Sequence, residues 1–190
     1  NFERDRTVAV SVDSQPIKML RYTAKKYSVA VSFGYYELCD EAIYSSYMFI
    51  GKNGEIVNNF RRVSKGWKEY DITDEHYKEG DGFKTFTYMG KRIALAVCGD
   101  LWYEENIEQI NKEKFDFLLY PVYVTYNTEM WRTKLVNEYA EQAKKIPRPV
   151  FLVNSICDAD NTRGGCYAFL NGKTVCEVPM GQDGYLLVRV

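Results

Sequence analysis

The sequence predicts a layered α/β protein, and its length of 190 residues favours a single domain. Apolar strand-like runs alternate with amphipathic helix-like segments along the chain, which is the pattern of sheets covered by helices. Some strands follow one another across short Gly-containing turns, so part of the sheet structure is expected to be antiparallel. Hydrophobic residues make up 46% and aromatic residues 15% of the chain, which supplies a packed core and excludes disorder.

The first half of the chain is expected to form a helix followed by strands. The helix begins at Ser14, with Pro16 in its first turn. Its apolar face is expected to hold Ile17, Leu20, Ala24 and Tyr27. Strands are expected over residues 28–35, 44–50 and 55–63. Residues 51–54, Gly-Lys-Asn-Gly, suit a hairpin turn with positive φ at Gly or Asn, and residues 65–82 are polar and irregular.

The second half is expected to continue with a hairpin and then with alternating helices and strands. Residues 83–88 and 92–97 pair across Met89 and Gly90. One helix covers residues 104–114, and a second runs from its cap Thr128 to Lys145, before Pro147 and Pro149. The apolar positions of the second helix are Met130, Leu135, Val136, Tyr139 and Ala143. Further strands are expected over residues 116–120, ending at Pro121, and over residues 150–154, 166–170, 174–178 and 185–190.

Charge and composition exclude several classes of function. The 25 Lys and Arg residues nearly balance the 26 Asp and Glu residues, so no basic surface for nucleic acid or an anionic membrane is expected. No apolar run approaches the roughly 20 residues that span a bilayer. His76 is the one histidine in the sequence, which excludes a His-rich metal site. We expect neither a metal nor a cofactor.

The cysteines indicate free thiols. Their number is odd and no Cys-x-x-Cys pair occurs, so neither a disulfide framework nor a zinc site is expected. A reducing, cytoplasmic compartment fits this pattern. The cysteines lie at positions 39, 98, 157, 166 and 176.

The clearest candidate for chemistry is Cys98, which follows the apolar run of residues 93–97 and precedes Gly99 and a helix start. A strand that delivers a cysteine into a tight turn exposes the thiol and lets the next backbone N–H face a developing oxyanion. A nearby helix N-terminus also favours the thiolate. The alternative is that Cys98 is a small buried apolar residue.

A charged loop before this strand offers partners for a nucleophile. Lys68 and Glu75 lie seven positions apart, between residues 65 and 82. A lysine near a thiolate stabilises a tetrahedral intermediate, and a carboxylate moves protons. The alternative is that both side chains are solvated surface charges.

Taken together, these blocks resemble the carbon–nitrogen hydrolase (nitrilase) superfamily over nearly the whole chain. The order and spacing of the motifs carry the resemblance. They are Gly-Tyr-Tyr-Glu at 34–37, Tyr-Ser-Ser at 44–46, Gly-Glu-Ile-Val at 54–57, Phe-Arg-Arg at 60–62, the Glu-x-Tyr-x-x-Gly loop at 75–80, Val-Cys-Gly-Asp at 97–100, the Asp-to-Pro strand at 116–121, Val-Asn at 153–154 and Gly-Gly-Cys at 164–166.

The resemblance implies an α-β-β-α sandwich, with residues 1–190 forming a single carbon–nitrogen hydrolase domain that is partial at its N-terminus. It implies a Glu-Lys-Cys triad in which Cys98 is the nucleophile and the lysine and the Gly99 N–H stabilise the intermediate. The implied substrates are small-molecule amides, carbamoyl compounds or nitriles, and a homodimer or higher homo-oligomer is expected. Glu75 matches a second acid of the family site.

Two departures from the family pattern affect these expectations. The strand, the helix and the general-base glutamate that precede the region matching Asn1 have no counterpart, so we expect residues 1–190 alone to be hydrolytically inactive. The family lysine directly follows Tyr-Arg, where this chain has Arg62. Lys68 is our preferred replacement, Lys65 the second and Arg62 itself the third; Arg62 would favour a pseudoenzyme.

Several further residues are candidates for the substrate pocket. Asp100 and Trp102 are expected to shape it behind the nucleophile, with a purely structural role as the alternative. Tyr123, Tyr126 and Trp131 follow the strand that ends at Pro121, where substrate loops lie in α/β sheets, with packing as the alternative. The competing function is a noncatalytic scaffold that lacks the general base.

Overall fold

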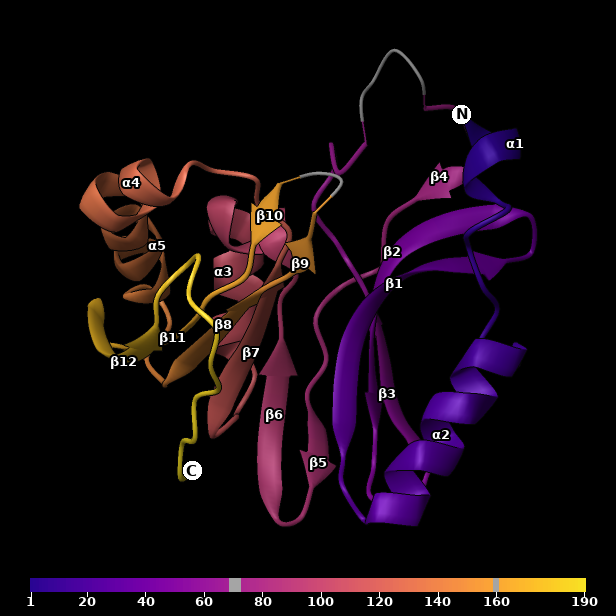
Figure 1. Cartoon of the computed structure of the whole chain (residues 1–190), viewed down its shortest axis with the longest axis horizontal. Helices are drawn as coiled ribbons and strands as arrows, with labels where there is room; N and C mark the ends of the chain where they lie inside the picture. The colour runs from indigo at the N-terminus through magenta and orange to yellow at the C-terminus, as the bar shows by residue number, and fades with distance from the viewer. Residues whose placement is uncertain (69–72, 159–160) are drawn as a thin grey trace. The chain divides into compact units, whose positions relative to one another are not determined.

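The computed structural model describes residues 1–68, 73–158 and 161–190. Its elements can be followed in Figure 1. The chain divides into two compact units, Asn1–Gly82 and Phe83–Val190, which are described one at a time below.

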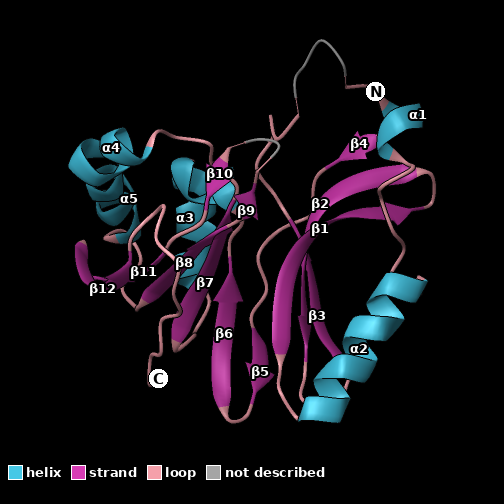
Figure 2. Cartoon of the chain, in the orientation of Figure 1, coloured by secondary structure: helices cyan, strands magenta, loops and turns pink. Residues whose placement is uncertain are grey.

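The first unit is a small sheet with a helix packed against it (Figure 2). Strands β1 (Val31–Cys39), β2 (Ala42–Ile50) and β3 (Ile56–Arg61) pair in antiparallel order, and β4 (Tyr77–Lys78) pairs in parallel with β2. The helices are α1 (Phe2–Asp5) and α2 (Gln15–Tyr27). Ile17 and Ala24 of α2 pack against Met48 and Ile50 of β2, and this contact forms one of the unit's cores.

Most expectations for this unit are confirmed, with corrections at element ends. Helix α2 is capped at Ser14 as predicted, but Leu20 and Tyr27 are 36% and 65% exposed, so the predicted face was too wide. The first strand begins at Val31 rather than residue 28, because Ser28 takes a left-handed conformation that ends the helix. The hairpin at residues 51–54 forms, and Gly54 has φ +82° with Arg21 packed against it. Part of the predicted irregular segment, residues 69–72, lies outside the described residues.

A buried ionic network fixes the edge of this sheet. Glu37 is 2% exposed and accepts two hydrogen bonds from Arg61, at 3.0 and 2.7 Å. Ser46 and Asn59 donate to the same carboxylate at 2.6 and 3.0 Å. The Arg61 guanidinium also lies 3.7 Å from the centre of the Tyr44 ring. These contacts hold the end of β3, after which the Lys68 segment begins.

The second unit is a six-stranded mixed sheet in the order β12-β11-β8-β7-β6-β5. Strands β6, β7 and β8 are parallel, so their carboxyl ends meet at one edge, and the remaining neighbours are antiparallel. The strands are β5 (Phe86–Tyr88), β6 (Lys91–Leu95), β7 (Phe117–Val122), β8 (Val150–Asn154), β11 (Cys166–Leu170) and β12 (Lys173–Val178). Strands β9 (Ile156–Cys157) and β10 (Thr162–Arg163) form a separate pair.

Helices cover one face of this sheet. They are α3 (Glu104–Lys112), α4 (Thr128–Met130) and α5 (Val136–Ala143), together with the 3₁₀ turn η2 (Cys98–Trp102) and the π-helical turn η3 (Trp131–Leu135). The core between sheet and helices includes Leu118 and Tyr120 of β7, Ile110 of α3, and Trp131 and Tyr139. Alternate residues of β7 therefore point to the helices.

The structure of the second unit differs from several of the expectations drawn from the sequence. Asn127, not Thr128, caps the helix, because its side chain accepts from the N–H groups of Glu129 and Met130. Met130 is 51% exposed and Trp131 takes the buried position beside it. Strand β7 continues through Pro121, which pairs with Val153.

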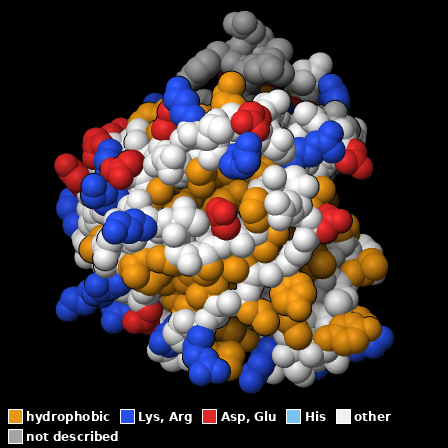
Figure 3. All heavy atoms as spheres, turned by 60° about the vertical axis from the view of Figure 1, so that its left-hand side comes forward, with side chains coloured by type: hydrophobic (Ala, Val, Ile, Leu, Met, Phe, Trp, Pro, Cys, Tyr) orange, Lys and Arg blue, Asp and Glu red, His pale blue; other side chains and the backbone are white. Residues whose placement is uncertain are grey.

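The ends of the predicted elements also differ at the C-terminal side. Residues 185–190 do not form the predicted strand, because a strand needs a neighbouring edge and none pairs with them. Apolar side chains of this segment, including Tyr185 and Leu187, are exposed instead. Figure 3 shows hydrophobic side chains gathered on the face that it presents.

Within the described ranges, no helix has both the length and the apolarity required to cross a bilayer.

Candidate active site

Cys98 lies just beyond the carboxyl end of β6, at the start of η2, as the apolar run predicts. Its backbone has φ +48°, in the left-handed region that a non-glycine residue rarely adopts. The residue is half-buried, so its thiol is not enclosed in the core. A strand that ends in a strained residue followed by a tight turn is the arrangement that presents a nucleophile at the edge of a sheet.

Asp100 holds this turn together. Its carboxylate accepts the Val97 N–H at 2.8 Å, and its own N–H donates to the Val97 carbonyl at 3.0 Å. Asn106 donates to the Asp100 carbonyl at 3.1 Å. Asp100 is completely buried, which favours the structural alternative for this residue: it shapes the turn that carries Cys98.

Two backbone groups beside the thiol have different surroundings. The Tyr120 hydroxyl of β7 donates to the Cys98 carbonyl at 2.6 Å. The Gly99 N–H has no acceptor among the residues that the structure describes. An unpaired N–H directly after a nucleophile is the donor that an oxyanion requires.

Aromatic side chains enclose the space around this turn. Trp102 meets Tyr139 edge-on at 5.1 Å between ring centres, and Tyr139 lies 4.9 Å from Trp131. Burial, followed by the nearby Cys98, raises the pKa of Tyr139 far above its ordinary value, so its hydroxyl keeps its proton. The aromatic cluster therefore offers neutral rings and hydrogen-bond donors rather than charges.

The predicted pocket aromatics divide into two groups. Trp102, Tyr123 and Tyr126 are between 40% and 46% exposed. Trp131 is 1% exposed and donates to the Tyr167 hydroxyl at 2.8 Å, which favours the packing alternative for this residue.

The ammonium group of Lys68, in the first unit, is surrounded by a carboxylate and two aromatic rings. Its ammonium lies 2.9 Å from a carboxylate oxygen of Asp5, which also accepts the Tyr77 hydroxyl at 2.6 Å. The same ammonium lies 5.4 Å from the Tyr36 ring centre and 5.6 Å from that of Tyr77. Its side chain is only 17% exposed, which argues against the solvated-surface alternative.

The other two candidates for the lysine role have different surroundings. Lys65 is exposed, and Arg62 donates to the Ser64 hydroxyl at 2.7 Å. Of the three candidates, Lys68 is therefore the one whose charge is held by a buried carboxylate.

Glu75 is an exposed residue in the turn before β4. Its neighbour Asp74 organises the turn by accepting from both the backbone and the ring of His76, at 3.0 and 2.8 Å. Sequence reasoning assigned no functional role to Asp5 or Tyr120. No local pattern points to Asp5, whereas Tyr120 lies in the buried strand that the sequence predicts, which continues to Val122.

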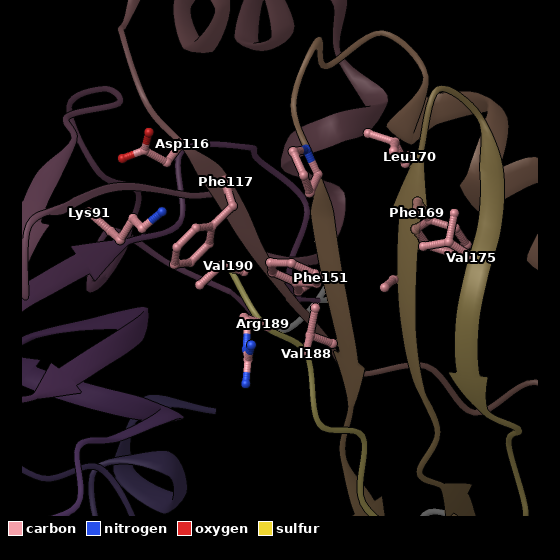
Figure 4. Close-up of a pocket in the computed structure, with 12 residues that line it drawn as sticks. Lys91, Asp116, Phe117, Phe151, Phe169, Leu170, Val175, Val188, Arg189 and Val190 are labelled. Atoms are coloured by element: carbon pink, nitrogen blue, oxygen red, sulfur yellow. The ribbon is translucent and has the colours of Figure 1, made fainter.

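A cavity of about 300 Å³ in the second unit is distinct from the Cys98 turn (Figure 4). Lys91, Phe117 and Phe151 line it, and all three lie at the amino ends of their strands. Cys98 follows the carboxyl end of β6, so this cavity lies at the opposite end of the parallel strands. Over residues 1–68, 73–158 and 161–190, no three His, Cys, Asp or Glu residues gather as metal ligands would.

Comparison with known proteins gives consistent matches. The family model described as Carbon-nitrogen hydrolase matches residues 1–190. The chain is 25% identical to a citrullinase from Francisella tularensis subsp. tularensis over 120 residues, which are 60% of this chain and 41% of the citrullinase.

Solved structures match the fold. A carbon-nitrogen hydrolase from Helicobacter pylori G27 superposes with a TM-score of 0.71 at 16% identity, covering 87% of this chain and 63% of the other. A mutant of the amidase from Nesterenkonia sp. AN1, solved with the acetamide moiety of fluoroacetamide added covalently at its active site cysteine, gives a TM-score of 0.69 at 15% identity, with 86% of this chain and 62% of the other covered. These likenesses confirm the expected α-β-β-α sandwich. The chain spans less than two thirds of the length of each of these relatives.

Proposed function

Because the chain belongs to the carbon–nitrogen hydrolase family, we propose that it cleaves a nonpeptide carbon–nitrogen bond of a small molecule through a thioester on Cys98. The observation that carries this proposal is the strained Cys98 turn with the unpaired Gly99 N–H beside it. The amidase from Nesterenkonia sp. AN1, which carries a covalent adduct at its active site cysteine, supports a cysteine nucleophile here.

The proposed chemistry follows from the groups described. For an amide substrate, the Cys98 thiol loses its proton to a base and its sulfur bonds to the carbonyl carbon. The negative charge that develops on the oxygen is bound by the Gly99 N–H. We assign to Lys68 the role of the lysine that the family resemblance implies. The carbon–nitrogen bond then breaks, the amine leaves with a proton, and water hydrolyses the thioester to the acid and the free thiol. Glu75 orients Lys68 or the substrate in this scheme.

The substrate class is an amide, a carbamoyl compound or a nitrile. Relatives with similar sequences include a citrullinase and an N-carbamoylputrescine amidase as well as a bromoxynil-specific nitrilase and a cyanide hydratase, so carbamoyl compounds and nitriles are tested side by side. Trp102, Tyr123 and Tyr126 are exposed and aromatic, and they suit a flat or apolar part of the substrate. We propose no cofactor, and neither nucleic acid nor a membrane as a partner.

The first test measures Cys98-dependent acyl transfer. Wild type and Cys98→Ala are incubated with 4-nitrophenyl acetate and with a panel of amides, carbamoyl compounds and nitriles, and the adduct is located by mass spectrometry. We expect 4-nitrophenyl acetate, whose leaving group needs no proton, to form a thioester at Cys98 faster than on free cysteine, whereas turnover of the amides, carbamoyl compounds and nitriles is not expected of residues 1–190 alone. Cys166→Ala is the matched control, because Cys166 is also a half-buried free thiol, in a strand rather than a strained turn.

A second arm tests the lysine. Lys68→Met should slow acylation of Cys98, whereas Lys65→Met should not, because Lys65 is exposed. Labelling of Cys98 no faster than of a free thiol, with no acyl transfer, would contradict the proposed enzymatic function and favour the noncatalytic scaffold.

We further propose that residues 1–190 act as a single cytoplasmic domain in a homodimer or higher homo-oligomer, which light scattering after gel filtration would test.

A further inference from the structure

Tyr120 makes a contact that the proposed chemistry does not use. Its hydroxyl, on the neighbouring strand β7, donates to the carbonyl of Cys98 itself at 2.6 Å. The donor and acceptor residues are 22 positions apart in the sequence, and the bond joins β7 to the turn η2 that follows the parallel strand β6.

The carbonyl that Tyr120 binds belongs to the same peptide group as the Gly99 N–H. The chain has no cis peptide bonds among the described residues, so this group is trans and planar. In a trans peptide the C=O and N–H bonds point in opposite directions. A hydrogen bond that fixes the carbonyl oxygen therefore also fixes the direction of the Gly99 N–H, on the side away from Tyr120.

The surroundings of Tyr120 favour this hydrogen bond. Tyr120 is completely buried, and burial raises the pKa of its hydroxyl well above the ordinary value, so the proton is always present to donate. A buried hydroxyl without a partner is costly, so the hydroxyl keeps its hydrogen bond to the Cys98 carbonyl.

The backbone at Cys98 needs such a restraint. A residue at φ +48° relaxes if its peptide groups are free to rotate, and rotation of the peptide between Cys98 and Gly99 would turn the N–H away from the substrate. The Val97 and Asp100 contacts hold the peptides on either side of this group. Tyr120 holds the peptide group that carries the oxyanion donor.

We propose that Tyr120 is a positioning residue for catalysis, which aims the Gly99 N–H at the oxyanion by binding the Cys98 carbonyl. This inference rests on the proposed function, because it requires that an oxyanion forms beside Cys98. Tyr120 does not touch the substrate, and its effect is transmitted through one rigid peptide group.

The test compares two reactions of the same thiol in the full chain. Acylation of Cys98 by 4-nitrophenyl acetate passes through an oxyanion, whereas alkylation by iodoacetamide displaces iodide at a tetrahedral carbon and forms none. Tyr120→Phe removes the hydroxyl and keeps the ring. Tyr167→Phe is the matched control, because the Tyr167 hydroxyl is also buried and hydrogen-bonded, to Trp131 and to the Met180 N–H.

We expect Tyr120→Phe to slow acylation about tenfold, a fraction of the loss seen when an oxyanion donor is removed, and to leave alkylation within about twofold of wild type. Tyr167→Phe should leave both rates near wild type. Unchanged acylation in Tyr120→Phe would overturn the inference, and so would a parallel loss of both rates, since that would report a damaged fold. If wild-type Cys98 is acylated no faster than free cysteine, the proposed function itself fails, before any variant is compared.

Discussion

The buried ionic network at Glu37 gives a sharp prediction about stability. Glu37→Gln keeps the size of the side chain but removes its charge, so the two hydrogen bonds from Arg61 lose their charged acceptor. Hydrogen bonds to charged groups contribute about 1.5 to 3 kcal/mol each, which gives about 3 to 6 kcal/mol for the pair. Because the Arg61 side chain is 31% exposed and is partly solvated after the change, we expect about 3 kcal/mol, at the low end.

The assay is urea unfolding at neutral pH, followed by the fluorescence of tryptophan. Glu129→Gln is the control, since it breaks the exposed ion pair with Arg132 and should cost less than about 0.5 kcal/mol. A free energy of unfolding for Glu37→Gln within about 0.5 kcal/mol of wild type would refute the reasoning, because it would mean that the carboxylate charge contributes nothing beyond what an amide supplies.

Two further predictions concern stability. Asn127→Ala should lower the free energy of unfolding by about 1 kcal/mol through loss of the helix cap, whereas Thr128→Ala should cost clearly less, as thermal unfolding would show. Burial acts to raise the pKa of Asp5, but hydrogen bonds from Tyr77 and Lys68 outweigh it, so the pKa lies below its ordinary value of 3.8. A depressed carboxyl pKa stabilises the fold above that ordinary value and ceases to do so as the pH falls through the folded-state pKa. In an acid titration of stability, wild type should therefore lose a stabilisation that Asp5→Asn lacks at every pH. Curves of stability against pH that run parallel for the two proteins would contradict this.

The part of the candidate site that local sequence predicts well is the Cys98 turn. A buried apolar strand, a glycine and a helix start are all short-range signals, and together they place the thiol at a strand end. Its partner Tyr120 was harder to predict, because it lies 22 positions away on β7 and only the pairing of strands brings it to Cys98. In the first unit, Tyr77 of β4 and Asp5 of α1 are 72 positions apart, and only the tertiary fold brings them together.

The same distinction explains the errors in the fold. The helix after Ser14 and the hairpins have caps and turn residues that act locally, and they form as predicted. Residues 185–190 carry an apolar run rich in residues that favour strands, but strand formation depends on a free edge elsewhere in the fold, which the segment itself does not encode. The cap at Asn127 was misplaced by one residue because Asn and Thr are both good caps and stand side by side.

The wide turn η3 has a consequence for how this segment tolerates change. Its backbone hydrogen bonds span five residues, whereas those of the α-helical segments α4 and α5 on either side span four. Trp131, at the start of this turn, and Tyr139, beyond its end, both lie in the core. An α-helix rotates each successive residue by about 100°, so the eight steps from Trp131 to Tyr139 would set the two side chains about 80° apart in a regular α-helix. The wide turn absorbs one residue, which lets both side chains face the same core. Conversion of η3 to regular α-helix without a deletion would therefore separate the two rings, whereas conversion together with the deletion of one residue would keep them in phase.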